Sequence, residues 1–277
     1  MGRTTSVKVF ISADLEGISG VVAGLQTDDN EKEFERARRL MTGEVNAAIS
    51  GAFGAGASEV LVNDSHGSMR NILIEDLDVR AELVTGSPKP YSMMEGLDES
   101  FDVALFIGYH AQAGSPLGTL NHTYSGRHVF QIKLNGQPVG EVGLNAALAG
   151  ALGVPVGLVT GDQAVVEEAQ RLLAPPAVVA VKTAVARSAA RCLPPAVARQ
   201  RIEAAASEAV RRRGTPFRLE PPITAELTCM RTDQADMAEL IPGVERVDGR
   251  TVRYQHEDMR TLFKVWRAML ALAAYVG

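Results

Sequence analysis

The chain has 277 residues, of which 46% are hydrophobic and 22% are charged, a composition typical of a globular protein with one elaborated domain or two. Its formal net charge of -5 argues against a nucleic-acid partner, and no apolar run reaches the ~18 residues that would suggest a membrane span. The two cysteines lie in unrelated contexts, and residues 1–6 are polar and lead straight into an apolar run, so we expect a cytoplasmic protein with reduced thiols.

The first 173 residues alternate between segments typical of strands and segments typical of helices. Residues 7–12 are expected to form a strand, and residues 30–55 a long helix whose apolar side chains recur at helical spacing. Further strands are expected at residues 59–62, 81–84 and 103–107. The last of these runs has no polar residue, which is typical of a strand buried on both faces of a mainly parallel sheet.

The alternation continues through a hairpin. Residues 127–134 alternate polar and apolar side chains and end in Asn135-Gly136, a two-residue turn signal, and a helix is expected to start near Glu141. Residues 156–160 form the next expected strand, and Asp162 can cap a helix that runs to about Leu173.

The pattern changes after residue 177. Here we expect strands at residues 178–183, 217–219, 223–228 and 251–255, and helices at 195–213, 233–240 and 259–273. The predicted fold class is therefore α/β, with an N-terminal, mainly parallel, Rossmann-like sheet flanked by helices and a smaller α+β C-terminal domain. The expected domains are residues 1–176 and 177–277, with an approximate boundary.

Five side chains follow apolar runs or open a helix, and together they could hold two metal ions. They are Asp14, Glu16, His66, His110 and Glu141. Taken singly, each has an ordinary explanation, such as a helix cap, a solvated loop side chain or an acid in a first helical turn. Strand ends of an α/β sheet converge on one crevice, however, and imidazoles with shared carboxylates suit zinc.

A sixth residue is the candidate for proton transfer. His122 lies in the long stretch from residue 111 to 126, rich in Gly, Ser and Thr, and loops of that length inside a domain are usually functional or mobile. The alternative is a surface histidine. We expect His128 and His256 to be structural, because neither directly follows a buried strand of the α/β half.

At these residues the chain resembles the zinc-dependent D-aminopeptidase family (DppA-type). Five segments in the family's order carry the resemblance, namely residues 12–20, 59–66, 94–98, 105–111 and 139–146.

The resemblance implies a ring-shaped decamer of two-domain subunits, each with two zinc ions, that releases N-terminal D-residues from short peptides such as D-Ala-D-Ala. It also implies that Asp14, Glu16, His66, His110 and Glu141 are the zinc ligands, with Asp14 bridging, and that His122 is the catalytic histidine. Agreement around His122 is looser than elsewhere.

We therefore expect a cytoplasmic zinc aminopeptidase that acts on small peptides. Two alternatives stay open. One is a dinuclear phosphoesterase, for which the motif segments have almost none of the Arg and Lys that a phosphate calls for. The other is a non-catalytic, metal-stabilised peptide-binding protein. No G-x-S-x-G or H-E-x-x-H sequence occurs, so a serine hydrolase or a thermolysin-like zinc site has no support.

Overall fold

The computed structural model describes residues 6–29, 31–174 and 176–276, and its strands form two sheets. The strands of the larger sheet are β1 (Val7–Ala13), β2 (Ala57–Asp64), β3 (Glu82–Val84), β4 (Val103–Tyr109), β7 (Val156–Asp162), β8 (Ala177–Ala186) and β9 (Ala189–Cys192). Their order is β3-β2-β1-β4-β7-β8-β9, and all neighbours are parallel except β8 and β9. Every residue of β4 is buried, as its apolar sequence predicted for an interior strand.

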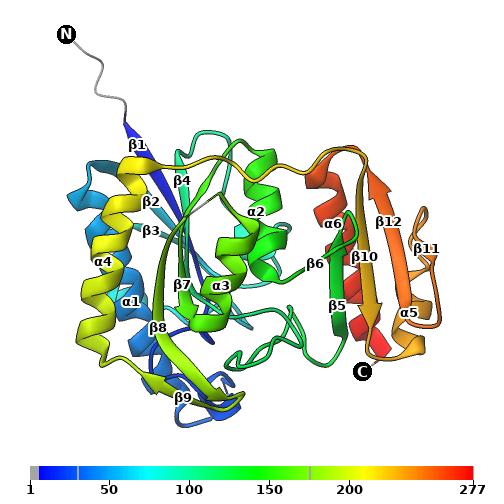
Figure 1. The fold of residues 1–277 in the computed structure, drawn as a ribbon, viewed down its shortest axis with the longest axis horizontal. Coiled ribbons are helices and arrows are strands. Elements are labelled where there is room, and N and C mark those ends of the chain that lie inside the picture. Colours follow the sequence, from blue (N-terminus) through cyan, green and yellow to red (C-terminus); the bar gives the residue numbers. More distant parts are fainter. Residues whose placement is uncertain (1–5, 30, 175, 277) are drawn as a thin grey trace.

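The smaller sheet is antiparallel. Its strands are β5 (Val129–Leu134), β6 (Gln137–Val139), β10 (Ile223–Cys229), β11 (Glu245–Arg246) and β12 (Thr251–His256). They are ordered β11-β12-β10-β5-β6, so the hairpin of β5 and β6 pairs with strands from the far end of the chain. Figure 1 shows this sheet at one end of the molecule's long axis.

Helices cover both faces of the large sheet. The α-helices of the described residues are α1 (Phe34–Gly54), α2 (Glu141–Ala151), α3 (Gln163–Leu172), α4 (Pro195–Arg212), α5 (Thr232–Ala238) and α6 (Met259–Ala273), of which the first four cover the large sheet. Helices α1 and α4 pack against each other on one face, at the end of the molecule opposite the small sheet (Figure 1), and α2 and α3 lie on the other face. Helix α6 packs on β10 and β12, and its Trp266 shares one core with Phe106 of β4 and Val142 of α2.

Most of the predicted elements are confirmed. The apolar face expected for residues 30–55 is buried in α1, although its predicted start at Asn30 lies outside the described residues and the observed helix begins at Phe34. Asp162 caps α3, since its Oδ1 accepts a hydrogen bond from Val165 N at 2.9 Å. No helix in the described ranges is long and apolar enough to cross a membrane.

Three details differ from the prediction. The strand expected at residues 217–219 is absent, because this stretch runs into Pro221-Pro222, which have no backbone N–H to offer a neighbouring strand. Strands β9 and β11 were not predicted, since each is short and gains its hydrogen bonds from one neighbour.

The sheets also divide the chain differently from the boundary predicted after residue 176. Strand β8 pairs with β7 in the large sheet, whereas β5 and β6 belong to the small one. The small sheet therefore combines residues from both predicted domains. The two domains expected at residues 1–176 and 177–277 stay a prediction.

Candidate metal centre

Three neighbouring strands of the large sheet bring the predicted ligands to one edge. Asp14 directly follows β1, His66 lies two residues after β2, and His110 directly follows β4. Because β2, β1 and β4 are adjacent and parallel, their carboxyl ends lie side by side. Glu141 reaches the same place as the first residue of α2, where the helix dipole favours a carboxylate.

A glycine just after β1 lets the chain pass very close to the end of the neighbouring strand β4. Gly17 N donates a hydrogen bond to Gly108 O at 2.7 Å, and a Cβ on Gly17 would lie 1.9 Å from Tyr109 O. No side chain fits there without moving the backbone of the β4 end. This close approach keeps both carboxylates of the Asp14-Leu15-Glu16 stretch beside His110.

Asp14 lies between the two predicted histidine ligands. Its Oδ1 is 3.4 Å from His66 Nδ1, and its Oδ2 is 3.4 Å from His110 Nε2. Glu16 Oε2 lies 2.8 Å from His66 Nδ1, and Glu141 Oε1 lies 3.4 Å from His110 Nε2. One carboxylate thus faces two imidazoles, each of which has a second carboxylate beside it, as two adjacent metal positions require.

Hydrogen bonds from outside the centre orient these ligands. His66 Nε2 donates to Thr27 O at 2.8 Å and His110 Nδ1 donates to Ala111 O at 3.1 Å, so the opposite nitrogen of each ring faces the carboxylates. Glu141 Oε1 accepts a hydrogen bond from Tyr124 N at 2.6 Å. Such bonds select the tautomer and orientation of a metal-binding imidazole.

Several polar atoms at the centre are buried without a hydrogen bond among the described residues. They are Asp14 Oδ2, Glu16 Oε2 and His110 Nε2, and their side chains are almost fully enclosed. An unsatisfied buried polar atom costs ~1–3 kcal/mol, more when it is charged. Ligand atoms of Asp14, Glu16 and His110 lie within 4.8 Å of one another, as do those of His110, His122 and Glu141. The donor set therefore fits two zinc ions.

Without a metal ion, protons on Asp14, His66 and His110 offset the negative charge of the clustered carboxylates. Burial, followed by repulsion from Glu16, raises the pKa of Asp14 to about 7. Burial opposes the charge on His110, but Glu141 and Asp14 outweigh it and raise the pKa of His110 to about 10. Burial likewise opposes the charge on His66, but the nearby carboxylates, Glu16 above all, outweigh burial and raise the pKa of His66 well above its usual value.

We expect zinc affinity to fall as the pH is lowered. A metal binds only the neutral imidazole, so at pH 7 it must displace the protons that the raised pKa values keep on His66 and His110. Each displaced proton makes affinity rise by about tenfold per pH unit. Competition with a chelator of known affinity at pH 6, 7 and 8 measures this slope, and a pH-independent affinity would contradict it.

His122 lies against the centre on the loop between β4 and β5. Its ring stacks on His110 with centroids 4.1 Å apart and planes inclined by 15°, and its Nε2 is 4.0 Å from Glu141 Oε1. Its Nδ1 donates to Leu120 O at 2.9 Å, so Nε2 is the nitrogen without a proton when the ring is neutral. Burial and the charge of His110 lower the pKa of His122, which favours that neutral form.

Sequence reasoning missed a buried lysine that supports the metal-binding loop. Lys182 of β8 donates through Nζ to the backbone oxygens of Glu16, Ile18 and Val21, the Ile18 bond being 3.1 Å long. The side chain is only 2% exposed. A lysine in a strand usually reads as a solvated residue, and no feature of the sequence marks it as an exception.

Lys182→Met is expected to lower the free energy of unfolding by ~2–4 kcal/mol, because it leaves three carbonyl oxygens without their charged donor. Zinc affinity should fall as well, since the loop carrying Glu16 loses its support. Urea unfolding and zinc titration measure the two effects. Lys8→Met is the control, because the side chain of Lys8 in β1 is 33% exposed and forms an ion pair with Glu59 at the surface. Equal stability of the two variants would contradict the prediction.

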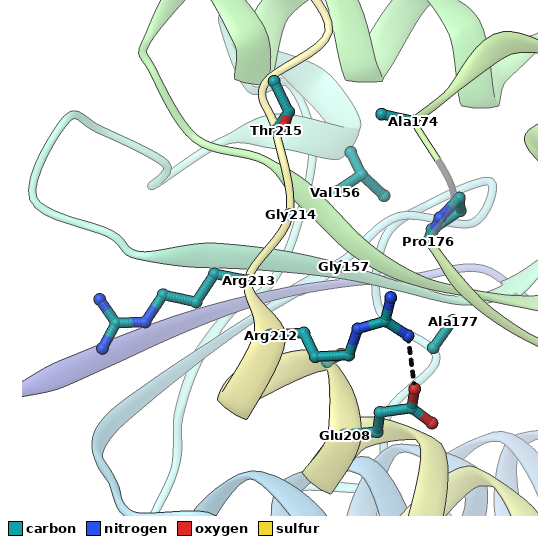
Figure 2. Close-up of a pocket in the computed structure, with 11 residues that line it drawn as sticks. Val156, Gly157, Ala174, Pro176, Ala177, Glu208, Arg212, Arg213, Gly214 and Thr215 are labelled. Atoms are coloured by element: carbon teal, nitrogen blue, oxygen red, sulfur yellow. Dashed lines mark hydrogen bonds and ion pairs between the residues drawn. The ribbon is translucent and has the colours of Figure 1, made fainter.

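A separate cavity lies at the opposite edge of the large sheet. It has a volume of about 180 Å³ and is lined by Val156 at the start of β7 and by Glu208, Arg212 and Arg213 around the end of α4 (Figure 2). Arg212 pairs with Glu208 and Arg213 pairs with Asp102, each at 2.8 Å. Its guanidinium groups already have carboxylate partners, so we assign the cavity no role.

Comparisons with known proteins agree over nearly the whole chain. The family model described as D-aminopeptidase matches residues 7–268. A D-aminopeptidase of Bacillus subtilis (strain 168) is 40% identical over 272 residues, covering 96% of this chain and 98% of the relative. The solved structure of the Zn-dependent D-aminopeptidase DppA from Bacillus subtilis, a self-compartmentalizing protease, has a TM-score of 0.94 at 38% identity, covering 97% of this chain and 98% of that one.

Proposed function

The chain belongs to the D-aminopeptidase family, and on that premise we propose that it is a dinuclear zinc aminopeptidase that releases an N-terminal D-residue, such as D-Ala, from short peptides. The observation that carries the proposal is the position of Asp14, whose two oxygens face His66 and His110. This buried carboxylate accepts one backbone hydrogen bond, from Leu15 N, and its second oxygen accepts none among the described residues, so hydrogen bonding to the fold does not explain its burial. It suits a bridging ligand.

We assign the two zinc positions from the charges and distances. Asp14, Glu16 and His66 would hold one ion, and Asp14, His110 and Glu141 the other. This is the ligand set expected from the sequence. When bound, zinc polarises a carbonyl and lowers the pKa of water toward neutrality.

The protein's own contribution to the reaction is proton transfer at His122. Its Nε2 is unprotonated in the neutral ring and faces the centre, so it can accept a proton from water as a peptide carbonyl is attacked. The same proton can then pass to the nitrogen of the leaving amine, which balances the hydrolysis of one peptide bond.

The decisive experiment is cleavage of a mixed library of D- and L-dipeptides by the zinc-loaded protein, followed by mass spectrometry with a chelated control. We expect release of N-terminal D-residues that stops when the metal is removed. Unchanged cleavage after complete metal removal would refute the mechanism. Stoichiometric zinc without any cleavage would favour the non-catalytic alternative, and cleavage of phosphoesters alone would favour the phosphoesterase.

Assembly into a ring-shaped decamer is part of the proposal, because the related DppA is a self-compartmentalizing protease. Phe130 and Met230 are 51% and 41% exposed and line one groove with His122, and exposed apolar surface of this kind often marks an interface. Sedimentation velocity of the zinc-loaded protein measures the number of chains. A cytoplasmic location stays a prediction.

A further inference from the structure

The pocket at the metal centre contains one basic side chain that the metal ligands do not explain. Arg267 of α6 lines this pocket together with Asp14, His110 and Glu141. It is the only Arg or Lys among the described residues that line it. Because α6 packs on the small sheet, this guanidinium comes from a part of the chain that supplies no predicted ligand.

Arg267 forms no hydrogen bond or ion pair with any described residue, although three carboxylates line the same pocket. Another arginine of the same helix does have carboxylate partners. Arg260, two turns earlier on α6, lies 3.1 Å from Glu99 and 3.5 Å from Asp258. A half-buried guanidinium that shares a pocket with three carboxylates and forms an ion pair with none of them points to an anion supplied by a ligand.

Stacking holds the guanidinium in place without using its N–H groups. Its carbon lies 5.4 Å from the ring centroid of Tyr124. Tyr124 is fixed in turn, because its hydroxyl donates to Asn145 Oδ1 at 3.1 Å and its ring packs edge-on against Trp266 with centroids 4.5 Å apart. A stacked guanidinium keeps its in-plane donors free for a bidentate bond to a carboxylate.

The same tyrosine links Arg267 to the reaction centre. Tyr124 N donates a hydrogen bond to Glu141 Oε1, and the ring of Tyr124 contacts Arg267. Tyr124 therefore contacts both the arginine and a proposed metal ligand. The pocket has a volume of about 230 Å³, smaller than the ~300–1,000 Å³ typical of ligand pockets, which favours a short substrate. The free carboxylate of a dipeptide lies only one residue beyond the scissile bond. A dipeptide bound at the metal centre can therefore place this carboxylate in the same pocket, which Arg267 also lines.

We propose that Arg267 binds the C-terminal carboxylate of the substrate and thereby selects dipeptides and other very short peptides with a free acid end. This inference rests on the proposed peptidase function. The motif segments held almost no Arg or Lys, which argued against a phosphate substrate, and Arg267 lies outside those segments. A peptide brings its own anion, so the unpaired guanidinium needs no phosphate to account for it.

The test compares D-Ala-D-Ala with its C-terminal amide, which has the same scissile bond but no carboxylate. The parent protein should prefer the acid by about 10- to 100-fold in kcat/KM, the effect of one charge-assisted bidentate bond. Arg267→Gln should bring the ratio of acid to amide close to one, mainly through a higher KM for the acid. Arg267→Lys keeps the charge without the planar fork and should give an intermediate ratio.

Lys264→Gln is the matched control. Lys264 lies about one turn earlier on α6, its Nζ is 4.8 Å above the ring of Tyr91, and it does not line the pocket. This variant removes one positive charge from the same helix and should keep the parent's ratio. Zinc content and melting temperature of all variants are measured alongside, and Arg267→Lys supplies the ratio if Arg267→Gln does not fold.

The possible outcomes distinguish a failure of carboxylate binding by Arg267 from a failure of the proposed peptidase function. Equal kcat/KM for acid and amide in the parent, or an unchanged ratio in Arg267→Gln, would overturn the inference and leave the peptidase standing. If the zinc-loaded parent cleaved neither peptide, the proposed function would fall and the inference with it. Cleavage of a phosphoester that depends on Arg267 would overturn both.

Discussion

Asp14→Ala is expected to reduce zinc content from two ions per chain to less than one, and to lower turnover by ~10⁴-fold or more. The reason is that Asp14 Oδ1 and Oδ2 face different histidines, so one side chain contributes to both metal positions. Removing Glu16 or Glu141 would weaken one position only. Metal analysis of the purified variant and a D-Ala-D-Ala cleavage assay measure the two effects.

The fold of Asp14→Ala should survive, which makes the result interpretable. Asp14 Oδ1 accepts a hydrogen bond from the neighbouring Leu15 N, and the other polar contacts of Asp14 among the described residues are with His66 and His110 of the site itself. Circular dichroism should therefore match that of the parent. Asp76→Ala, which removes an exposed carboxylate outside the pocket, is the control. Two bound zinc ions in Asp14→Ala would disprove the bridging role.

His122→Ala is expected to keep both zinc ions while turnover falls by about 10²- to 10⁴-fold, the usual contribution of general acid–base catalysis. In this interpretation the ring carries a proton between water and the leaving amine and binds no metal. Its Nε2 is 4.0 Å from Glu141 Oε1, and its stacking on His110 holds it beside the metal centre. Zinc analysis and kcat on D-Ala-D-Ala measure the outcome.

His128→Ala is the matched control for this variant. His128 lies just before β5, its Nδ1 is 2.7 Å from Ser125 Oγ, and it does not line the metal pocket, so activity should stay near that of the parent. Full activity in His122→Ala would end the proton-transfer role. Loss of one zinc ion would instead make His122 a ligand, an arrangement that its proximity to His110 and Glu141 also permits.

The strand ends of the large sheet could be predicted from sequence because each signal is local. The apolar run that became β4 predicted a buried strand, and His110 follows it without a gap. The same holds for Asp14 after β1 and His66 shortly after β2. Parallel strands present their carboxyl ends at one edge, so their convergence followed from the fold class.

Residues that act from other elements could not be found in this way. Lys182 reaches the Glu16 loop only because β8 joins the large sheet beside β7, a pairing across residues that the predicted boundary had separated. Arg267 reaches the pocket only because α6 packs between the small sheet and α2. Neither residue was singled out from the sequence, because sequence periodicity reports which side of an element is apolar and not which element lies opposite.

The sequence by itself determined the α/β character of the chain, the positions of its main buried strands along the chain and five candidate ligands that follow these strands or open a helix, because apolar periodicity and turn residues act over short distances. Only the tertiary structure decided that one carboxylate lies between two imidazoles, that His122 stacks on His110, and that the guanidinium of Arg267 lines the same pocket without an ion pair to any described residue. Those relations depend on contacts between different strands, loops and helices, which follow from how sheets and helices pack.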